Sequence, residues 1–141
     1  MPDTLWMKLR KVRWEDFPTS PSCKKNLPRL LESLASRKES RAMKASHDVW
    51  TALCSGKVYP AAEAACPFLI DILQISEPAV QGEILDMLIK FAQVPNDETA
   101  ESWQKHLHRM LQGEQGYFTK LSGSTDAIVA DKASTLIGII K

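Results

Sequence analysis

The sequence predicts an all-α protein built from stacked helical hairpins. Apolar residues recur every three or four positions through most of the chain, as they do along one face of an α-helix. Proline, glycine, asparagine and aspartate occur between these segments, where turns are expected. A pattern of apolar positions also recurs after 39 residues. No long stretch alternates apolar and polar residues between hairpin turns, so we expect no sheet.

The first segment, residues 4–17, is expected to form a short amphipathic helix. Leu5, Leu9 and Val12 have helical spacing, and most of the basic residues fall on the opposite side. A loop rich in proline and serine follows. We expect residues 1–25 to cap one end of the fold.

Residues 26–55 are expected to form the first hairpin. Asn26 is a suitable N-cap for its first helix and Pro28 suits the first turn, where a backbone N–H is not needed. The second helix is expected over residues 39–55. Gly56 is expected to end it, because glycine adopts the left-handed conformation of a helix C-cap at little cost.

Residues 58–93 are expected to form the second hairpin. Pro60 can start its first helix, and Pro67 lies inside the apolar pattern. A proline there removes one helical hydrogen bond, so we expect a kink or a split at Pro67. Glu77 and Pro78 open the second helix, which is expected over residues 77–93.

Residues 97–141 are expected to form a third, degenerate hairpin. Asn96 or Asp97 is expected to cap its first helix, which is interrupted at the glycines 113 and 116. Thr125 or Asp126 is expected to cap the last helix, over residues 125–140. Terminal repeats are commonly atypical, because their outer face meets water.

The repeat follows from a comparison of the first two hairpins. Residues 27–34 match residues 66–73 position by position, and the same offset of 39 carries Val49 to Leu88 and Leu53 to Ala92. A hairpin period of ~40 residues is typical of HEAT and armadillo solenoids. One hairpin cannot bury both of its apolar stripes, whereas stacking covers them. We expect residues 1–141 to form one domain, a short right-handed superhelix of about three HEAT-like hairpins with an N-terminal capping helix.

The segment from Asp48 to Ile70 resembles part of bacterial HEAT-repeat-like proteins. A helix ends in a glycine turn, followed by Tyr59, an alanine-rich stretch and a Pro-Phe-Leu helix. The tail from Gly116 to Leu136 is similar to their final repeat. The resemblance covers roughly residues 26–140 and implies a protein-binding superhelix. Some such bacterial proteins are associated with neutralising toxins delivered between cells. Many members have a His-Gln-Gly turn where this chain has Cys54-Ser-Gly-Lys, so no role of that histidine carries over.

The composition favours a soluble protein. Hydrophobic residues make up 44% of the chain and charged residues 25%, and no apolar run approaches the ~20 residues of a membrane helix. The first residues lack the layout of a signal peptide, so we expect a cytoplasmic location. Cys23, Cys54 and Cys66 have no zinc-binding spacing; we expect Cys54 and Cys66 to be reduced thiols in the core.

No catalytic motif occurs in the sequence. His106 and His108 are two positions apart and would point to different sides of a helix, so we expect both to be surface residues and no metal site. His47, which is followed by an aspartate, is interpreted in the same way. Glu83 and Asp86 are expected on a solvated acidic face, and Trp50 and Trp103 in the core. We therefore expect no enzyme and no cofactor.

The predicted function is that of a non-catalytic protein-binding module. Residues 1–45 hold eleven basic and five acidic residues (net +6), and residues 46–141 hold seven and twelve (net −5). Such a dipole can steer a charged partner, although two solvated ends would look the same. In HEAT-like stacks the second helices line the inner face, and the offset places Lys44 over Glu83 and His47 over Asp86. The partner, such as a toxin or a member of an assembly, is expected to contact Arg41, Lys44, His47, Asp48, Glu83, Asp86 and Lys90.

The alternative is nucleic-acid binding of the kind found in HEAT-like DNA glycosylases. Clustered cations bind phosphates, and the basic N-terminal third motivates this hypothesis. The acidic remainder would repel a duplex along the inner face, and three hairpins are short for gripping DNA and flipping a base. The cations concerned are Lys8, Arg10, Lys11, Arg13, Lys24 and Lys25.

Overall fold

The computed structural model describes residues 2–21 and 26–140, with backbone alone at residues 2–4 and 6. Every regular element in these residues is helical, which confirms the all-α fold class. The first half contains α1 (Pro2–Lys11), the short 3-10 helix η1 (Trp14–Asp16), α2 (Leu27–Leu34), α3 (Glu39–Cys54) and α4 (Ala61–Ile75). The second half contains α5 (Pro78–Ala92), α6 (Ser102–Gly113), α7 (Gln115–Leu121) and α8 (Ala127–Ile140).

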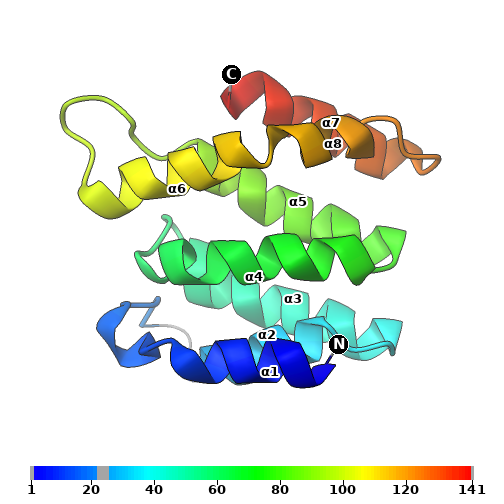
Figure 1. Cartoon of the computed structure of the whole chain (residues 1–141), viewed down its shortest axis with the longest axis horizontal. Coiled ribbons are helices and arrows are strands. Elements are labelled where there is room, and N and C mark those ends of the chain that lie inside the picture. Colours follow the sequence, from blue (N-terminus) through cyan, green and yellow to red (C-terminus); the bar gives the residue numbers. More distant parts are fainter. Residues whose placement is uncertain (1, 22–25, 141) are drawn as a thin grey trace.

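The helices are stacked from the N-terminal to the C-terminal end of the chain (Figure 1). α1 and α2 lie at one end, α4 crosses the middle, and α6, α7 and α8 lie at the other end. Behind α4, α3 packs against α2 and α5, and α5 packs in turn against α8. α3, α5 and α8 therefore form a row of neighbouring helices on one side of the molecule.

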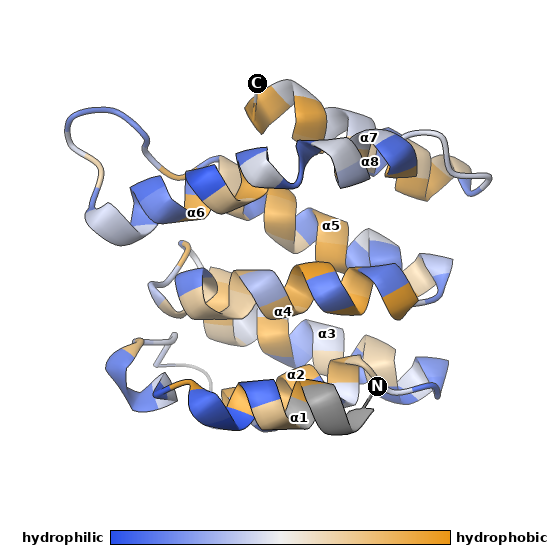
Figure 2. Ribbon diagram, in the orientation of Figure 1, coloured by the Kyte–Doolittle hydropathy of each residue, from blue (hydrophilic) through white to orange (hydrophobic). Residues whose placement is uncertain are grey.

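One apolar core runs through the whole stack, from Leu9 in α1 to Ile140 in α8. Apolar segments on α4 and α5 occupy its middle, as the hydropathy colouring shows (Figure 2). Phe91 and Phe118 are its largest fully buried side chains. Burying one large aliphatic or aromatic side chain stabilises a fold by about 1.5–3 kcal/mol, so the buried helix stripes hold the layers together.

The first helix is shorter than predicted. α1 ends at Lys11 rather than near residue 17, and the chain turns into η1. The indole nitrogen of Trp14 donates a hydrogen bond to the carbonyl oxygen of Leu9 at 2.8 Å. A carbonyl of the last helical turn thus obtains a side-chain partner, which lets the helix stop there.

Several helix ends agree with the predictions. The side chain of Asn26 accepts a hydrogen bond from the backbone N–H of Arg29, which confirms it as the N-cap of α2. Gly56 has φ of 78°, the left-handed conformation expected after α3. Asp126, rather than Thr125, caps α8, because its Oδ1 accepts from the N–H of Val129 at 3.0 Å.

Two local predictions are wrong. α4 continues from Ala61 to Ile75 across Pro67, so the predicted split at this residue is wrong; the proline is on the exposed side, while Ala65, Leu69 and their neighbours stay buried in the core. α6 is not capped by Asn96 or Asp97. It begins at Ser102, and its N-cap, Glu101, forms a reciprocal capping box with Gln104.

Candidate protein-binding groove

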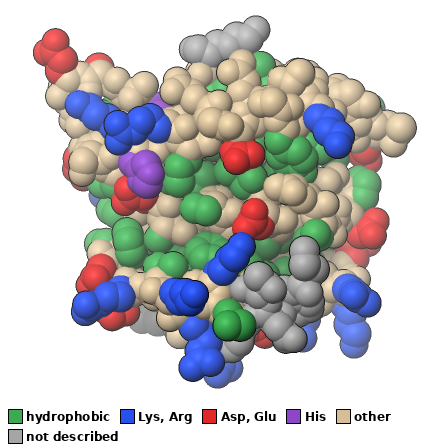
Figure 3. Space-filling view, in the orientation of Figure 1, with side chains coloured by type: hydrophobic (Ala, Val, Ile, Leu, Met, Phe, Trp, Pro, Cys, Tyr) green, Lys and Arg blue, Asp and Glu red, His purple; other side chains and the backbone are tan. Residues whose placement is uncertain are grey.

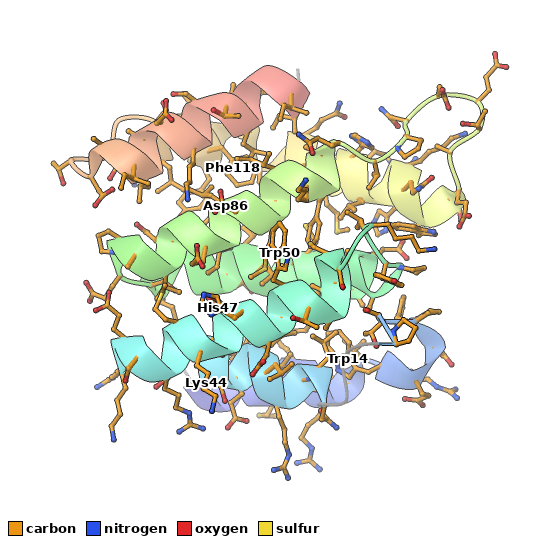
Figure 4. The ribbon with its side chains drawn as sticks, turned by 180° about the vertical axis from the view of Figure 1, so that it is seen from behind. Trp14, Lys44, His47, Trp50, Asp86 and Phe118 are labelled. Atoms are coloured by element: carbon orange, nitrogen blue, oxygen red, sulfur yellow. The ribbon has the colours of Figure 1, made fainter. Side chains whose placement is uncertain are left out.

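A groove of about 640 Å³ runs between α3 and α5. α3 contributes Ser46, His47, Trp50 and Thr51 to its wall. Ser46 belongs to the buried side of α3, and His47, Trp50 and Thr51 lie beside that side, toward the neighbouring helix. Figure 4 shows His47 and Trp50 in the space between the two helices.

The other wall comes from α5. Met87 is almost completely buried and Ile89 is half-buried, so they form apolar parts of the lining. Polar and charged residues surround them. These are Glu83, Asp86, Lys90 and Gln93.

Trp50 is the largest side chain of the groove. We expected it in the core, and it does pack against the core, but it remains half-buried and lines the groove. Helical spacing placed Trp50 next to the buried stripe of α3. The spacing did not indicate that one side of the indole would stay open.

His47 connects α3 to α5. Its Nε2 lies 3.3 Å from Oε1 of Glu83, and the side chains are 72% and 30% exposed. The expected alignment of Lys44 over Glu83 and His47 over Asp86 is therefore wrong. The sequence offset relates residues 39 positions apart, whereas His47 touches Glu83, which is 36 positions later and about one helical turn before Asp86.

Asp86 pairs with Lys132 of α8, a residue that the sequence analysis missed. Nζ of Lys132 lies 2.9 Å from Oδ2 of Asp86 and 3.4 Å from the backbone oxygen of Gly82. No signal in the sequence indicated this pair, because the 39-residue offset relates residues 27–53 to residues 66–92 and does not reach α8. The contact joins α8 to the α5 side of the groove.

The seven predicted partner-binding residues do not form one ridge. His47, Glu83, Asp86 and Lys90 line the groove together. The other three lie elsewhere on α3. Nη2 of Arg41 is directed to Oγ of Ser33 at 3.5 Å, Lys44 points away from α5 (Figure 4), and Asp48 is half-buried outside the groove lining.

The two histidines of α6 differ from each other. His106 is a surface residue, as expected, and its Nδ1 lies 2.6 Å from Oε2 of Glu63 in α4. His108 is only 7% exposed, so its prediction as a surface residue is wrong. Its Nε2 donates a hydrogen bond to the backbone oxygen of Val94 at 2.7 Å, which satisfies the buried ring.

The buried cysteines are poor nucleophiles. Cys54 and Cys66 are free thiols in the core, as expected, while Cys23 lies outside the described residues. Burial raises the pKa of each thiol to about 12, and the positive charge of Lys90 opposes this rise at Cys54. Both thiols are therefore protonated near neutral pH.

Within residues 2–21 and 26–140, no three metal-ligating side chains are close enough to hold an ion. The same residues include no helix with the length and hydropathy needed to cross a bilayer.

Charge is separated along the stack. Lys and Arg side chains gather at the end formed by α1 and α2, and acidic side chains lie over the middle (Figure 3). Residues 46–101, which contain the groove, hold two basic and nine acidic residues. Of these, Glu83, Asp86 and Lys90 line the groove itself.

Comparison of the chain with protein-family models, curated proteins and solved structures gives no match.

Proposed function

We propose that the chain is a non-catalytic protein-binding module whose partner docks in the groove between α3 and α5. The observation that carries this proposal is the half-buried Trp50, which lines the groove together with Met87 and with the charged residues Glu83, Asp86 and Lys90. Protein interfaces commonly combine an aromatic and apolar centre with a polar rim, and Trp is enriched among the residues that contribute most to binding.

We further infer that the hairpins α2–α3 and α4–α5 are HEAT-like repeats of a short right-handed superhelix, which α6, α7 and α8 complete. The repeat offset supports this inference. Leu27, Leu30, Leu31 and Leu34 of α2 are buried, and so are the four residues 39 positions later, Cys66, Leu69, Ile70 and Leu73. The row formed by α3, α5 and α8 also supports it, because the second helices of such repeats line a shared binding face.

The charged rim suits a partner of complementary charge. Charge complementarity raises association rates and selects against wrong partners. One version of this function is a bacterial immunity protein that neutralises a toxin by direct binding, which is what the resemblance of residues 48–70 implies. A scaffold in an assembly is another version with the same groove.

Nucleic-acid binding receives less support. The cations Lys8, Arg10 and Lys11 are exposed on α1, but Glu83 and Asp86 lie in the groove and would repel phosphates. A duplex would therefore have to bind the α1 end alone, without the groove.

A photocrosslinking experiment tests the proposal. In the cells that produce the protein, the photocrosslinking amino acid p-benzoylphenylalanine replaces Lys90 or Gln93 in the groove. As matched controls, it replaces Asp71 or Gln74 on the exposed side of α4. We expect one discrete crosslinked protein from the groove positions and none from α4. The crosslink should disappear when Trp50→Ala is added.

Two controls make the result decisive. The first is circular dichroism, which must show that Trp50→Ala remains folded. The second is the substitution Lys90→Glu with the crosslinker at Gln93; Lys90 is exposed, so this change tests the loss of the crosslink without altering core packing. Equal crosslinking from α4 and the groove, or a groove crosslink that survives both substitutions, would overturn the proposal.

A further inference from the structure

The groove has an acidic end and a basic end. Glu83 and Asp86 lie one turn apart on α5, and Lys90 follows one turn later. From Glu83 to Lys90 the helix rises about 10 Å, because each residue adds 1.5 Å. His47 of α3 contacts Glu83 of α5, and seven residues further along both helices the charge of Lys90 acts on Cys54. α3 and α5 therefore run alongside each other, and Trp50 lies between the two charged ends.

The acidic end keeps hydrogen-bonding capacity. Glu83 contacts His47 through Oε1, and Asp86 contacts Lys132 through Oδ2. Each of these contacts uses one carboxylate oxygen, and the two side chains remain 30% and 40% exposed. The second oxygen of each carboxylate can therefore accept a hydrogen bond from a basic group that enters the groove.

We propose that the groove receives one amphipathic helix of the partner protein, with a basic residue against Glu83 and Asp86, an apolar residue against Trp50 and Met87, and an acidic residue against Lys90. This inference rests on the proposed protein-binding function and specifies the partner. The order of charges along α5 then determines which way the partner helix points.

The walls of the groove favour a helix over an extended segment. Both walls are made of side chains from α3 and α5, whose backbone groups are used within their own helices. An extended segment would find no strand edge to pair with, whereas a helix satisfies its own backbone. Side chains at positions i, i+3 and i+7 of a helix lie on one face and match the two-turn spacing from Glu83 to Lys90.

Three synthetic peptides serve as probes. Each has about 15 residues and a hydrocarbon staple, because isolated helices of this length are marginal in water. They carry Lys–Leu–Glu, Lys–Leu–Lys or Glu–Leu–Glu at positions i, i+3 and i+7 and are otherwise identical. Binding to the full chain is followed by NMR through the indole N–H signal of Trp50, which is assigned with Trp50→Phe.

We expect the Lys–Leu–Glu peptide to bind about fivefold more tightly than either of the others, a ratio in the range measured for exposed ion pairs. The preference should vanish at about 0.5 M NaCl, where exposed charges are screened. In the variant Glu83→Lys/Asp86→Lys the groove is basic throughout, so Glu–Leu–Glu should become the preferred peptide. Asp71→Lys on α4 is the matched control and should leave the order unchanged.

Two results would overturn the inference. One is an order of affinities that ignores the charge pattern or follows Asp71→Lys as strongly as the groove variant. The other is equal binding of an unstapled Lys–Leu–Glu peptide in which a central proline prevents helix formation. If either occurs while the groove positions still crosslink a protein in a Trp50-dependent way, the helix inference fails and the protein-binding function stands.

Discussion

Replacing His108 should destabilise the fold far more than replacing His106, although the two residues are only two positions apart. His108 is 7% exposed, and its Nε2 donates to the backbone oxygen of Val94 at 2.7 Å. This bond connects α6 to the loop that follows α5. His106 is half-exposed and contacts Glu63 at the surface.

The magnitude follows from these two environments. His108→Ala removes a buried hydrogen bond and leaves the carbonyl of Val94 without its donor, which costs about 1–2 kcal/mol. The lost ring contacts and the space they leave add a similar amount, so we expect a total of about 2–4 kcal/mol. A protein of this size loses about 3–4 °C in Tm for each kcal/mol, which gives a decrease of about 6–16 °C.

Urea denaturation and thermal melting, both followed by circular dichroism, measure the effect. His106→Ala is the matched control; exposed ion pairs contribute about 0–1 kcal/mol, so its Tm should stay within about 4 °C of the wild type. His108→Leu keeps most of the volume but removes the donor and should fall between the two. Equal losses for His106→Ala and His108→Ala would refute the reasoning.

Three further predictions concern the thiols and the helix ends. In a Cys23→Ser background, Cys54 and Cys66 should not react with a disulfide reagent near pH 8 until denaturant is added, and rapid labelling of the native chain would contradict this. Because burial raises the pKa of each thiol from 9.0 to about 12, the free energy of unfolding should fall as the pH rises between these two values. Gly56→Ala should cost about 1 kcal/mol in urea denaturation, because φ of 78° strains a residue with a Cβ; an unchanged midpoint would show that the turn relaxes. Asp126→Ala should cost about 1 kcal/mol through loss of the α8 cap, while Asp126→Asn should retain most of the stability; equal losses would exclude capping as the cause.

The helices could be predicted because the required signals are local. An apolar residue every three or four positions gives a helix one buried side, whatever it packs against. Caps at Asn26, Gly56 and Asp126 act within one turn of the chain. The start of α6 was missed because Asp97 is also a good cap by type, and the reciprocal contact of Glu101 with Gln104 prevailed over it.

The groove could be predicted only in part. The 39-residue offset pointed to the two helices α3 and α5, and four of the seven proposed residues line the groove between them. The offset identifies residues that occupy corresponding places in their helices, but it does not identify which residues touch across α3 and α5. It therefore missed the contact of His47 with Glu83, and it gave no indication of Lys132, which lies outside the two segments that the offset relates.

The sequence by itself determined that the chain is helical, where most helices begin and end, and which stripe of each helix is buried, because these depend on neighbours within about a turn along the chain. Only the tertiary structure decided that His108 is buried, that Trp50 stays half-open, and that Glu83 and Lys90 lie at opposite ends of one groove. These properties depend on how far one helix is shifted against the next. That shift is set by the interlocking of side chains from distant segments, which no local pattern records.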